Sequence, residues 1–235
     1  MIPTTDVEPT APVPRGTGAP VWAADVFGPR LAQATAYAEL LAGAGIERGL
    51  LGPREADRVW GRHIGNSALV AELLPETGRL ADIGSGAGLP GIPIALRRPQ
   101  LEVVLVEPLL RRSQFLTEVV DELGLDNVTV VRERAEKLPK RSFDLVTARA
   151  VAPLPKLSQW ALPLLRAGGT LLALKGQSAS AELEEARSVL GRLAAEEATI
   201  EQVENESIGE SATIVRVRKQ GGARTATTGK DGQSA

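Results

Sequence analysis

The sequence predicts an α/β fold, with a doubly wound, mostly parallel seven-stranded sheet that follows an N-terminal helical extension. Three observations predict this fold. From about residue 79 onward, apolar runs of strand length alternate with helical stretches. The first apolar run, residues 80–83, leads into a loop with glycine at positions 84, 86 and 88. Helix-forming residues then follow, and strand, glycine loop and helix together form the nucleotide-binding corner of a doubly wound sheet.

The elements follow from local patterns. Residues 21–75 are predicted to be helical, because apolar residues recur at helical spacing on two stripes, and Gly43 and Gly45 suit the end of the first helix. Strands are predicted at residues 80–83, 102–106, 128–131, 143–148 and 169–174, with helices at 109–123, 157–165 and 179–195. Gly168 and Gly169 predict a turn into the fifth strand. Two last strands, near 198–204 and 211–218, are expected to pair as an antiparallel edge.

Four segments organise the chain. Residues 1–20, rich in Pro, Thr and Gly, are predicted to be disordered, and residues 21–75 form the helical extension. Residues 76–219 form the sheet domain, and residues 220–235 are predicted to be a loose tail of Gly, Thr and Ser. A chain of 235 residues is long enough to bury a large core.

The composition excludes several classes of protein. The chain has no cysteine, which excludes a disulfide scaffold, a zinc–thiolate site, a cysteine-ligated iron–sulfur cluster and a cysteine nucleophile. With a net charge of −2, the protein would bind nucleic acid through a local basic patch. Residues 1–20 lack the features of a signal peptide, and no apolar run reaches the length of a membrane helix. We expect a cytoplasmic protein without a metal or a membrane partner.

The glycine loop predicts a cofactor site. Its spacing is G-x-G-x-G, whereas dinucleotide enzymes have G-x-G-x-x-G. Glu107 ends the next apolar run, about 20 residues further on, where an acid can bind both ribose hydroxyls. We interpret the site as one for S-adenosylmethionine (AdoMet), which has no phosphate for the loop to bind. Gly84, Gly86 and Gly88 would let the backbone approach it. Asp82 would orient the methionine ammonium or satisfy loop amides, and both readings stay open.

Polar residues after the later strands complete the candidate site. Ala135 and Glu136 follow the third strand, where a backbone amide and a carboxylate can read the adenine edge. Arg149 ends the fourth strand, where it can bind the AdoMet carboxylate, a phosphate or a purine oxygen, or pair with a nearby acid. Lys175 ends the fifth strand and would face the same cleft. His63, the only histidine, lies on an apolar helix stripe, which favours a core histidine.

The residue types narrow the chemistry of methyl transfer. Carbon-5 methylation of pyrimidines usually needs a cysteine nucleophile, and radical methylation needs iron–sulfur cysteines. Enzymes that methylate exocyclic amines usually carry Asn or Asp before Pro-Pro and an aromatic residue, and this pattern is absent here. Guanine N7 has its own lone pair and needs no base, although ribose oxygens and small-molecule acceptors remain open. A methyltransferase of small molecules or proteins, a dinucleotide-dependent oxidoreductase and a non-catalytic AdoMet- or RNA-binding protein are the alternatives.

Longer motifs carry a resemblance to a known family. Residues 81–93 read Ala-Asp-Ile-Gly-Ser-Gly-Ala-Gly-Leu-Pro-Gly-Ile-Pro, and residues 62–67 read Arg-His-Ile-Gly-Asn-Ser. Residues 111–116, 148–150 and 173–176 read Arg-Arg-Ser-Gln-Phe-Leu, Ala-Arg-Ala and Ala-Leu-Lys-Gly. With these motifs the chain resembles, over about residues 30–218, the GidB (RsmG) family of bacterial 16S ribosomal RNA methyltransferases. One departure is the stretch 45–54, where many members carry Trp-Asn-x-x-x-Asn-Leu-Thr.

The resemblance implies a class I, Rossmann-like methyltransferase that uses AdoMet to methylate N7 of one guanine in 16S ribosomal RNA. The partner would be this RNA or the small ribosomal subunit, and we expect a monomer. By position, the resemblance places cofactor contacts on Gly84, Leu89, Ala135, Glu136 and Arg149. It also implies that Arg62, His63 and Lys175 join Arg149 as catalytic, RNA-facing or supporting residues.

Overall fold

The structure is a computed structural model that describes residues 18–221. The segments predicted to be disordered fall mostly outside the described residues, and the four-segment division stays a prediction. Within residues 18–221, no helix combines the length and the apolar character that crossing a membrane would require.

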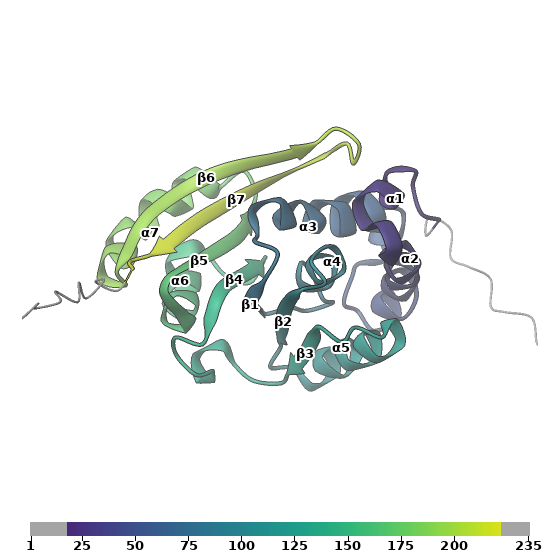
Figure 1. Cartoon of the computed structure of the whole chain (residues 1–235), viewed down its shortest axis with the longest axis horizontal. Helices are drawn as coiled ribbons and strands as arrows, with labels where there is room; N and C mark the ends of the chain where they lie inside the picture. The colour runs from purple at the N-terminus through teal and green to yellow at the C-terminus, as the bar shows by residue number, and fades with distance from the viewer. Residues whose placement is uncertain (1–17, 222–235) are drawn as a thin grey trace, which may run out of the picture.

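A seven-stranded sheet forms the centre of the molecule (Figure 1). Its strands are β1 (Gly78–Ile83), β2 (Leu101–Val106), β3 (Val128–Val131), β4 (Phe143–Arg149), β5 (Leu165–Lys175), β6 (Ala195–Asn205) and β7 (Glu210–Lys219). They lie in the order β3-β2-β1-β4-β5-β7-β6, and β1 to β5 are parallel. β7 runs antiparallel between β5 and β6, so the predicted antiparallel edge is confirmed. The strand order reverses at β1 and β4, which places a ligand crevice at their carboxyl ends.

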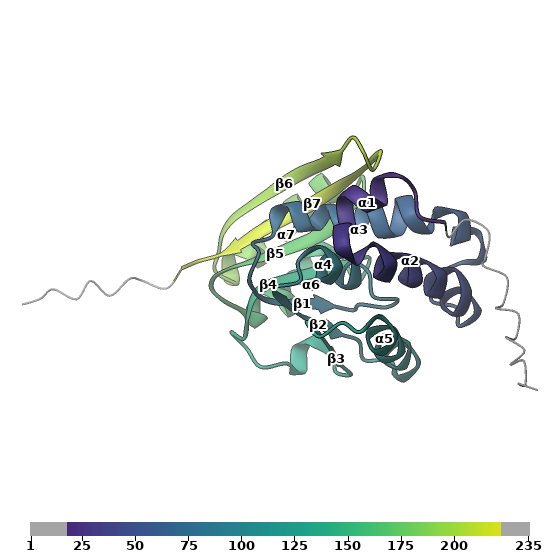
Figure 2. The same ribbon diagram turned by 45° about the vertical axis from the view of Figure 1, so that its right-hand side comes forward.

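Helices cover both faces of the sheet, as Figures 1 and 2 show. One face packs against α4 (Gly91–Arg97), α5 (Leu110–Leu123) and the N-terminal helices, and the other against α6 (Leu154–Leu164) and α7 (Ala179–Arg192). The two apolar clusters lie on opposite sides of the sheet, because successive side chains of a strand point to opposite faces. The predicted doubly wound fold is therefore confirmed.

The N-terminal extension is helical, with several short or irregular turns. Its α-helices are α1 (Trp22–Phe27), α2 (Leu31–Leu40) and α3 (Asn66–Ala68). After Leu40 the helix widens into a π-turn over Leu41–Gly45 and stays helical through Glu47, so it ends two residues beyond the predicted Gly45. A second π-turn, Val59–Gly65, follows a 3₁₀ segment, Pro53–Arg58, and buries Val59, Trp60, His63 and Ile64. The buried stripe predicted for this stretch is confirmed.

The turn predicted at Gly168 and Gly169 is wrong, because β5 already begins at Leu165. The two glycines instead lie in an irregular part of β5. Phe143 of β4 pairs with Leu165 and Leu145 pairs with Thr170, so the pairing register shifts across the glycines. Gly168 has φ +76°, and a Cβ on Gly169 would lie 2.8 Å from the Asp144 carbonyl oxygen. Glycine is needed here because two backbones approach closely inside the sheet.

The β6–β7 hairpin extends past the sheet toward the N-terminal helices (Figure 1). Ile208, in its turn, is buried in the same apolar cluster as Trp60 and Ile64. A Cβ on Gly65 would lie 2.8 Å from Ile208 Cγ2, so glycine makes room for this contact. The hairpin therefore brings the first residue of β7 beside the Val59–Gly65 turn.

Candidate cofactor and acceptor site

A first cavity of about 560 Å³ lies at the carboxyl ends of β1 to β4. Seven of the predicted cofactor residues line it: Gly84, Gly86, Leu89, Glu107, Ala135, Glu136 and Arg149. Four parallel strands end at this edge, so residues far apart in the sequence meet there.

The glycine loop forms one wall of the first cavity. Gly84 and Gly86 have φ +70° and +59°, left-handed values that glycine adopts without strain. A Cβ on Gly84 would lie 2.7 Å from Val151 Cγ2, so this residue must be small. The loop therefore exposes backbone rather than side chains to the cavity.

Glu107 connects this loop to the neighbouring strand. Its carboxylate is 2% exposed and accepts hydrogen bonds from the backbone N–H of Gly86 (3.1 Å) and of Leu109 (3.0 Å). Each carboxylate oxygen has a further lone pair, which leaves acceptor capacity for ribose hydroxyls. Glu107 thus shapes the loop and faces the cavity at the same time.

Asp82 and Gly88, also predicted as cofactor residues, lie behind the loop and do not line the cavity. Asp82 is fully buried; its Oδ2 accepts a hydrogen bond from Gly91 N–H at 3.0 Å. Its Oδ1 has no hydrogen-bond partner among the described residues. A Cβ on Gly88 would lie 2.7 Å from Ile92 Cγ1 and 3.0 Å from the Tyr37 hydroxyl. Gly88 is therefore placed for close packing behind the loop.

Tyr37 supports the loop from the helical extension, a role that sequence reasoning missed. Its hydroxyl donates a hydrogen bond of 2.8 Å to the Ala87 carbonyl. Burial raises the pKa of Tyr37 well above its ordinary value, so the hydroxyl remains a donor. No motif marks this residue, because its partner is a backbone atom that is distant in the sequence.

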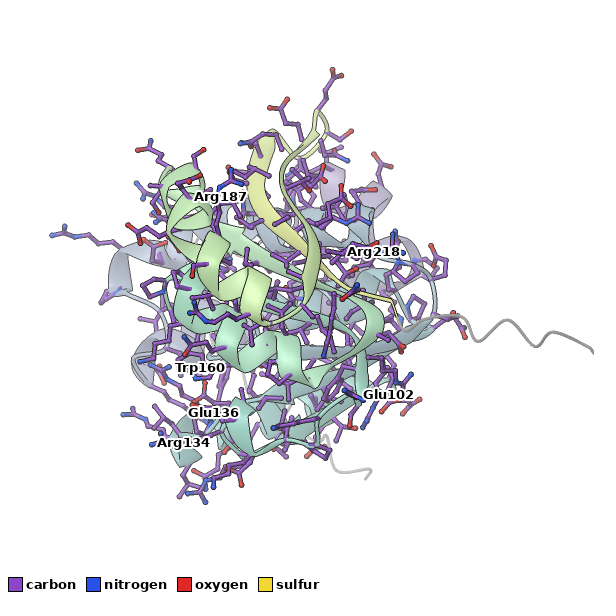
Figure 3. All side chains as sticks on the ribbon, turned by 90° about the vertical axis from the view of Figure 1, so that its left-hand side faces the viewer. Glu102, Arg134, Glu136, Trp160, Arg187 and Arg218 are labelled. Carbon is purple, nitrogen blue, oxygen red and sulfur yellow. The ribbon has the colours of Figure 1, made fainter. Side chains whose placement is uncertain are left out.

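The opposite wall of the first cavity combines charged and apolar groups. Ala135 and Glu136 lie in a 3₁₀ turn after β3, and Trp160 comes from α6. Figure 3 shows Trp160, Glu136 and Arg134 near one another at this edge. Sequence reasoning also missed Leu50 and Leu51, which line the cavity from the stretch that departs from the family pattern.

Arg149 lies at the end of β4 and contacts the helical extension. Its Nη1 donates to Ser67 Oγ at 3.0 Å and to the His63 carbonyl at 3.3 Å, and its Nη2 donates to His63 Nδ1. Since a guanidinium can only donate, Nδ1 must carry a lone pair. His63 Nε2 then carries the hydrogen and donates to Glu55 Oε2 at 2.7 Å. Burial, followed by the Arg149 charge, lowers the pKa of His63, which favours this neutral form.

A second cavity, of about 630 Å³, shares the wall Arg149–Val151 with the first. Arg62, Asn66, Lys175, Glu182 and Glu210 also line it. Ala150, in the shared wall, has φ +54°, a strained value for a residue other than glycine. His63 lines neither cavity and lies behind Arg149, so the structure brings Arg62, Arg149 and Lys175 to one cavity and His63 to its supporting layer.

Lys175 is held in a fixed position in the second cavity. Its Nζ donates to the Ala152 carbonyl at 2.7 Å and forms an ion pair of 2.7 Å with Glu182. Glu182 also accepts hydrogen bonds from the backbone N–H of Leu154 and from the Ser178 hydroxyl, both at 2.8 Å. Two donors of Lys175 are thereby occupied, and one remains for a ligand in the cavity.

Replacing Gly86 with aspartate is expected to weaken AdoMet binding at least about 100-fold, because a side chain would occupy space where the loop backbone approaches the ligand. The new carboxylate would lie in the cavity wall beside Glu107, on a residue with φ +59°. Calorimetric titration of the folded variant with AdoMet measures the effect. Gly191→Asp, on an exposed turn of α7 with nothing near its Cβ position, is the control. Unchanged affinity in Gly86→Asp would contradict the expectation.

Replacing Asp82 with asparagine is expected to change how stability depends on pH. Burial raises the pKa of Asp82 from 3.8 to about 7, so between these values the folded state binds more protons than the unfolded state. The free energy of unfolding that this group contributes therefore falls as pH rises through this range. Asparagine does not titrate, so the variant should gain stability relative to wild type as pH rises. Urea denaturation of both proteins at about pH 4.5 and about pH 8 tests this; a constant difference would refute it.

Comparisons with known proteins agree with this geometry. Residues 30–211 match the family GidB, described as rRNA small subunit methyltransferase G. A protein of Mycolicibacterium paratuberculosis, named ribosomal RNA small subunit methyltransferase G, is 53% identical over 238 residues, which cover 96% of each chain. A protein of the same name from Streptomyces coelicolor is 54% identical over 214 residues, 88% of this chain and 89% of its own.

Solved structures support the fold. A putative S-adenosyl-L-methionine-dependent methyltransferase from Methanococcus maripaludis superposes with a TM-score of 0.55 at 15% identity, over 74% of this chain and 95% of its own. The M. jannaschii protein TYW2 in complex with AdoMet gives a TM-score of 0.54 at 16% identity, over 66% of this chain and 74% of its own. The predicted fold class is confirmed by these likenesses. With the family match over most of its length and relatives more than half identical to it, the chain belongs to the GidB family of rRNA small subunit methyltransferases.

Proposed function

We propose that this protein transfers a methyl group from AdoMet to N7 of a guanine in 16S ribosomal RNA. The observation that carries the proposal is the pair of cavities that share the wall Arg149–Val151. One cavity has the loop and the acid expected of an AdoMet site, and the other has room for a base beside it. Methyl transfer requires this arrangement, since donor and acceptor must lie in line at short distance.

The residues of the first cavity fit AdoMet. The left-handed Gly84 and Gly86 present backbone rather than side chains to the cavity, and Glu107 has lone pairs left for the ribose hydroxyls. The unpartnered Oδ1 of Asp82 is fully buried behind this loop, so Asp82 supports the loop rather than contacting the cofactor directly. Ala135 and Glu136 line the side where the adenine would lie. When bound, AdoMet supplies a methyl group that its sulfonium already activates.

The second cavity fits an acceptor that needs positioning rather than a base. Arg62, Arg149 and Lys175 are cationic, and the Glu182 carboxylate is occupied by three partners. Guanine N7 attacks with its own lone pair, so no side chain has to remove a proton first. The three cations suit the phosphates and the O6 oxygen of a guanine nucleotide. We therefore assign binding and orientation of the nucleotide to Arg62, Arg149 and Lys175. We further propose that the enzyme acts in the cytoplasm, as a monomer, on the small subunit or its RNA.

Methylation of purified small subunits tests the proposal. Subunits from cells that lack the activity are incubated with the full chain and labelled AdoMet, and the labelled base is mapped and identified. N7-methylguanine at one position of the 16S RNA is the expected result. Label at another base or atom, or turnover only on free small molecules or proteins, would overturn the proposal. Tight AdoMet binding without any label in RNA would show a binding protein instead.

A further inference from the structure

The second cavity contains one carboxylate that no part of the site uses, that of Glu210. Within residues 18–221, its side chain has no hydrogen bond or ion pair. Glu182, the other acid in this cavity, is occupied by Lys175, Ser178 and the Leu154 amide. Glu210 lines the second cavity but not the first. A free carboxylate among cations therefore faces the space for the acceptor on the side away from the cofactor residues.

Two features of the fold bring Glu210 to this position. Glu210 is the first residue of β7, and Ile208, two residues earlier, is buried against the N-terminal helices. On the facing turn, a Cβ on Gly61 would lie 2.6 Å from Glu210 Oε1. The glycine at position 61 thus provides the room that the carboxylate occupies beside Arg62.

We propose that Glu210 reads the Watson–Crick edge of the target guanine, accepting hydrogen bonds from its N1–H and its N2 amino group. This inference rests on the proposed function. Guanine has two adjacent donors on this edge, and a carboxylate has two acceptor oxygens that match them in a bidentate pair. Adenine presents an acceptor at N1, so it would face the carboxylate with a lone pair.

The orientation of the base agrees with this assignment. N7 lies on the edge of guanine opposite the N2 amino group. A guanine that points its Watson–Crick edge at Glu210 therefore turns N7 toward the wall shared with the first cavity, where the methyl donor binds. Both contacts are made at once only if the base spans the second cavity.

The same contact would favour the reaction itself. The N7 lone pair forms the bond to the methyl carbon, the carbon–sulfur bond breaks, and its electron pair stays on sulfur. The purine gains one positive charge, which spreads over the ring and makes the N1 and N2 hydrogens stronger donors. A hydrogen bond to a carboxylate then strengthens in the transition state, so Glu210 should affect kcat more than KM.

The test compares two acceptors and two enzymes. Small subunits are reconstituted with RNA that carries either guanosine or inosine, which lacks the N2 amino group, at the mapped position. Wild type should prefer guanosine by about 10- to 100-fold in kcat/KM. In Glu210→Ala the ratio of kcat/KM on guanosine to kcat/KM on inosine should fall at least about fivefold, mainly through a lower kcat on guanosine. The comparison is a double-mutant cycle, because one change removes the carboxylate and the other removes the N2 amino group. Gly61→Ala, which displaces the carboxylate, should lower the ratio in the same direction.

Controls separate this role from a structural one. Glu206→Ala removes an exposed carboxylate in the same hairpin turn and should keep the wild-type ratio. The AdoMet affinity of Glu210→Ala, measured by calorimetry, must equal that of wild type. If Glu210→Ala does not fold, the guanosine-to-inosine ratio is measured instead in Glu210→Gln, which keeps the shape of the side chain but loses its charge. A folded variant with the wild-type ratio overturns the inference and leaves guanine methylation standing. A wild-type enzyme that transfers no methyl group to this RNA overturns both.

Discussion

Replacing Arg149 with leucine is expected to lower kcat/KM for methylation of small subunits about a thousandfold. Arg149 lies in the wall that both cavities share, next to the space proposed for the donor and the space proposed for the acceptor. Three hydrogen bonds, to Ser67 Oγ, the His63 carbonyl and His63 Nδ1, fix its position before any ligand binds. Burial lowers the pKa of Arg149 from its very high ordinary value, and arginine still carries its charge in proteins.

Steady-state kinetics on labelled AdoMet measure this loss, and calorimetry measures the accompanying change in AdoMet affinity. Arg187→Leu is a suitable control, because Arg187 is exposed on α7 (Figure 3) and, among residues 18–221, forms an ion pair with Glu184 alone. If Arg149→Leu folds and retains activity within about threefold of wild type, Arg149 has no part in binding or catalysis.

The second large effect is expected at His63. His63→Leu removes the acceptor for Arg149 Nη2 and the donor for Glu55 Oε2, so both atoms lose the hydrogen bond that the imidazole ring makes to them. An unsatisfied buried group costs about 1–3 kcal/mol, so kcat/KM should fall roughly 10- to 100-fold as Arg149 loses its fixed position. His63→Asn places an amide oxygen near the position of Nδ1 and should restore part of kcat, whereas His63→Gln reaches toward Glu55 and should not.

Two readouts distinguish positioning from mere stability. The rescue by asparagine should appear in kcat, with similar urea denaturation midpoints for the asparagine and glutamine variants. The pH profile is the second readout: protonated His63 would turn an N–H toward the guanidinium of Arg149. Because its pKa in the folded state is lowered from 6.5, the folded state binds fewer protons, and acidification below 6.5 should reduce the free energy of unfolding. Activity should fall only at the lower pH where His63 becomes protonated in the folded protein. Equal activity of all three variants would contradict the role.

The helical extension contributes residues to the walls of both cavities. Sequence reasoning placed its second stripe in the core, and Val59, Trp60 and Ile64 are indeed buried. The same stretch carries His63, which the residue pattern alone favoured as a core histidine and which the resemblance moved toward the site. Both descriptions hold in part, since the ring is buried and its Nδ1 accepts from Arg149.

The sequence by itself determined the strand–helix alternation, the glycine loop and the acid Glu107. These features depend on local patterns: apolar periodicity, backbone conformations that only glycine adopts easily, and a fixed spacing between neighbouring strands. Only the tertiary structure decided that Tyr37 holds the loop, that Asp82 and Gly88 lie behind it, and that Glu210 meets Gly61. These contacts join residues far apart in the chain, and they depend on backbone atoms or on the space that a glycine leaves. Such contacts leave no pattern in one sequence and exist only after the sheet, the hairpin and the helices have packed.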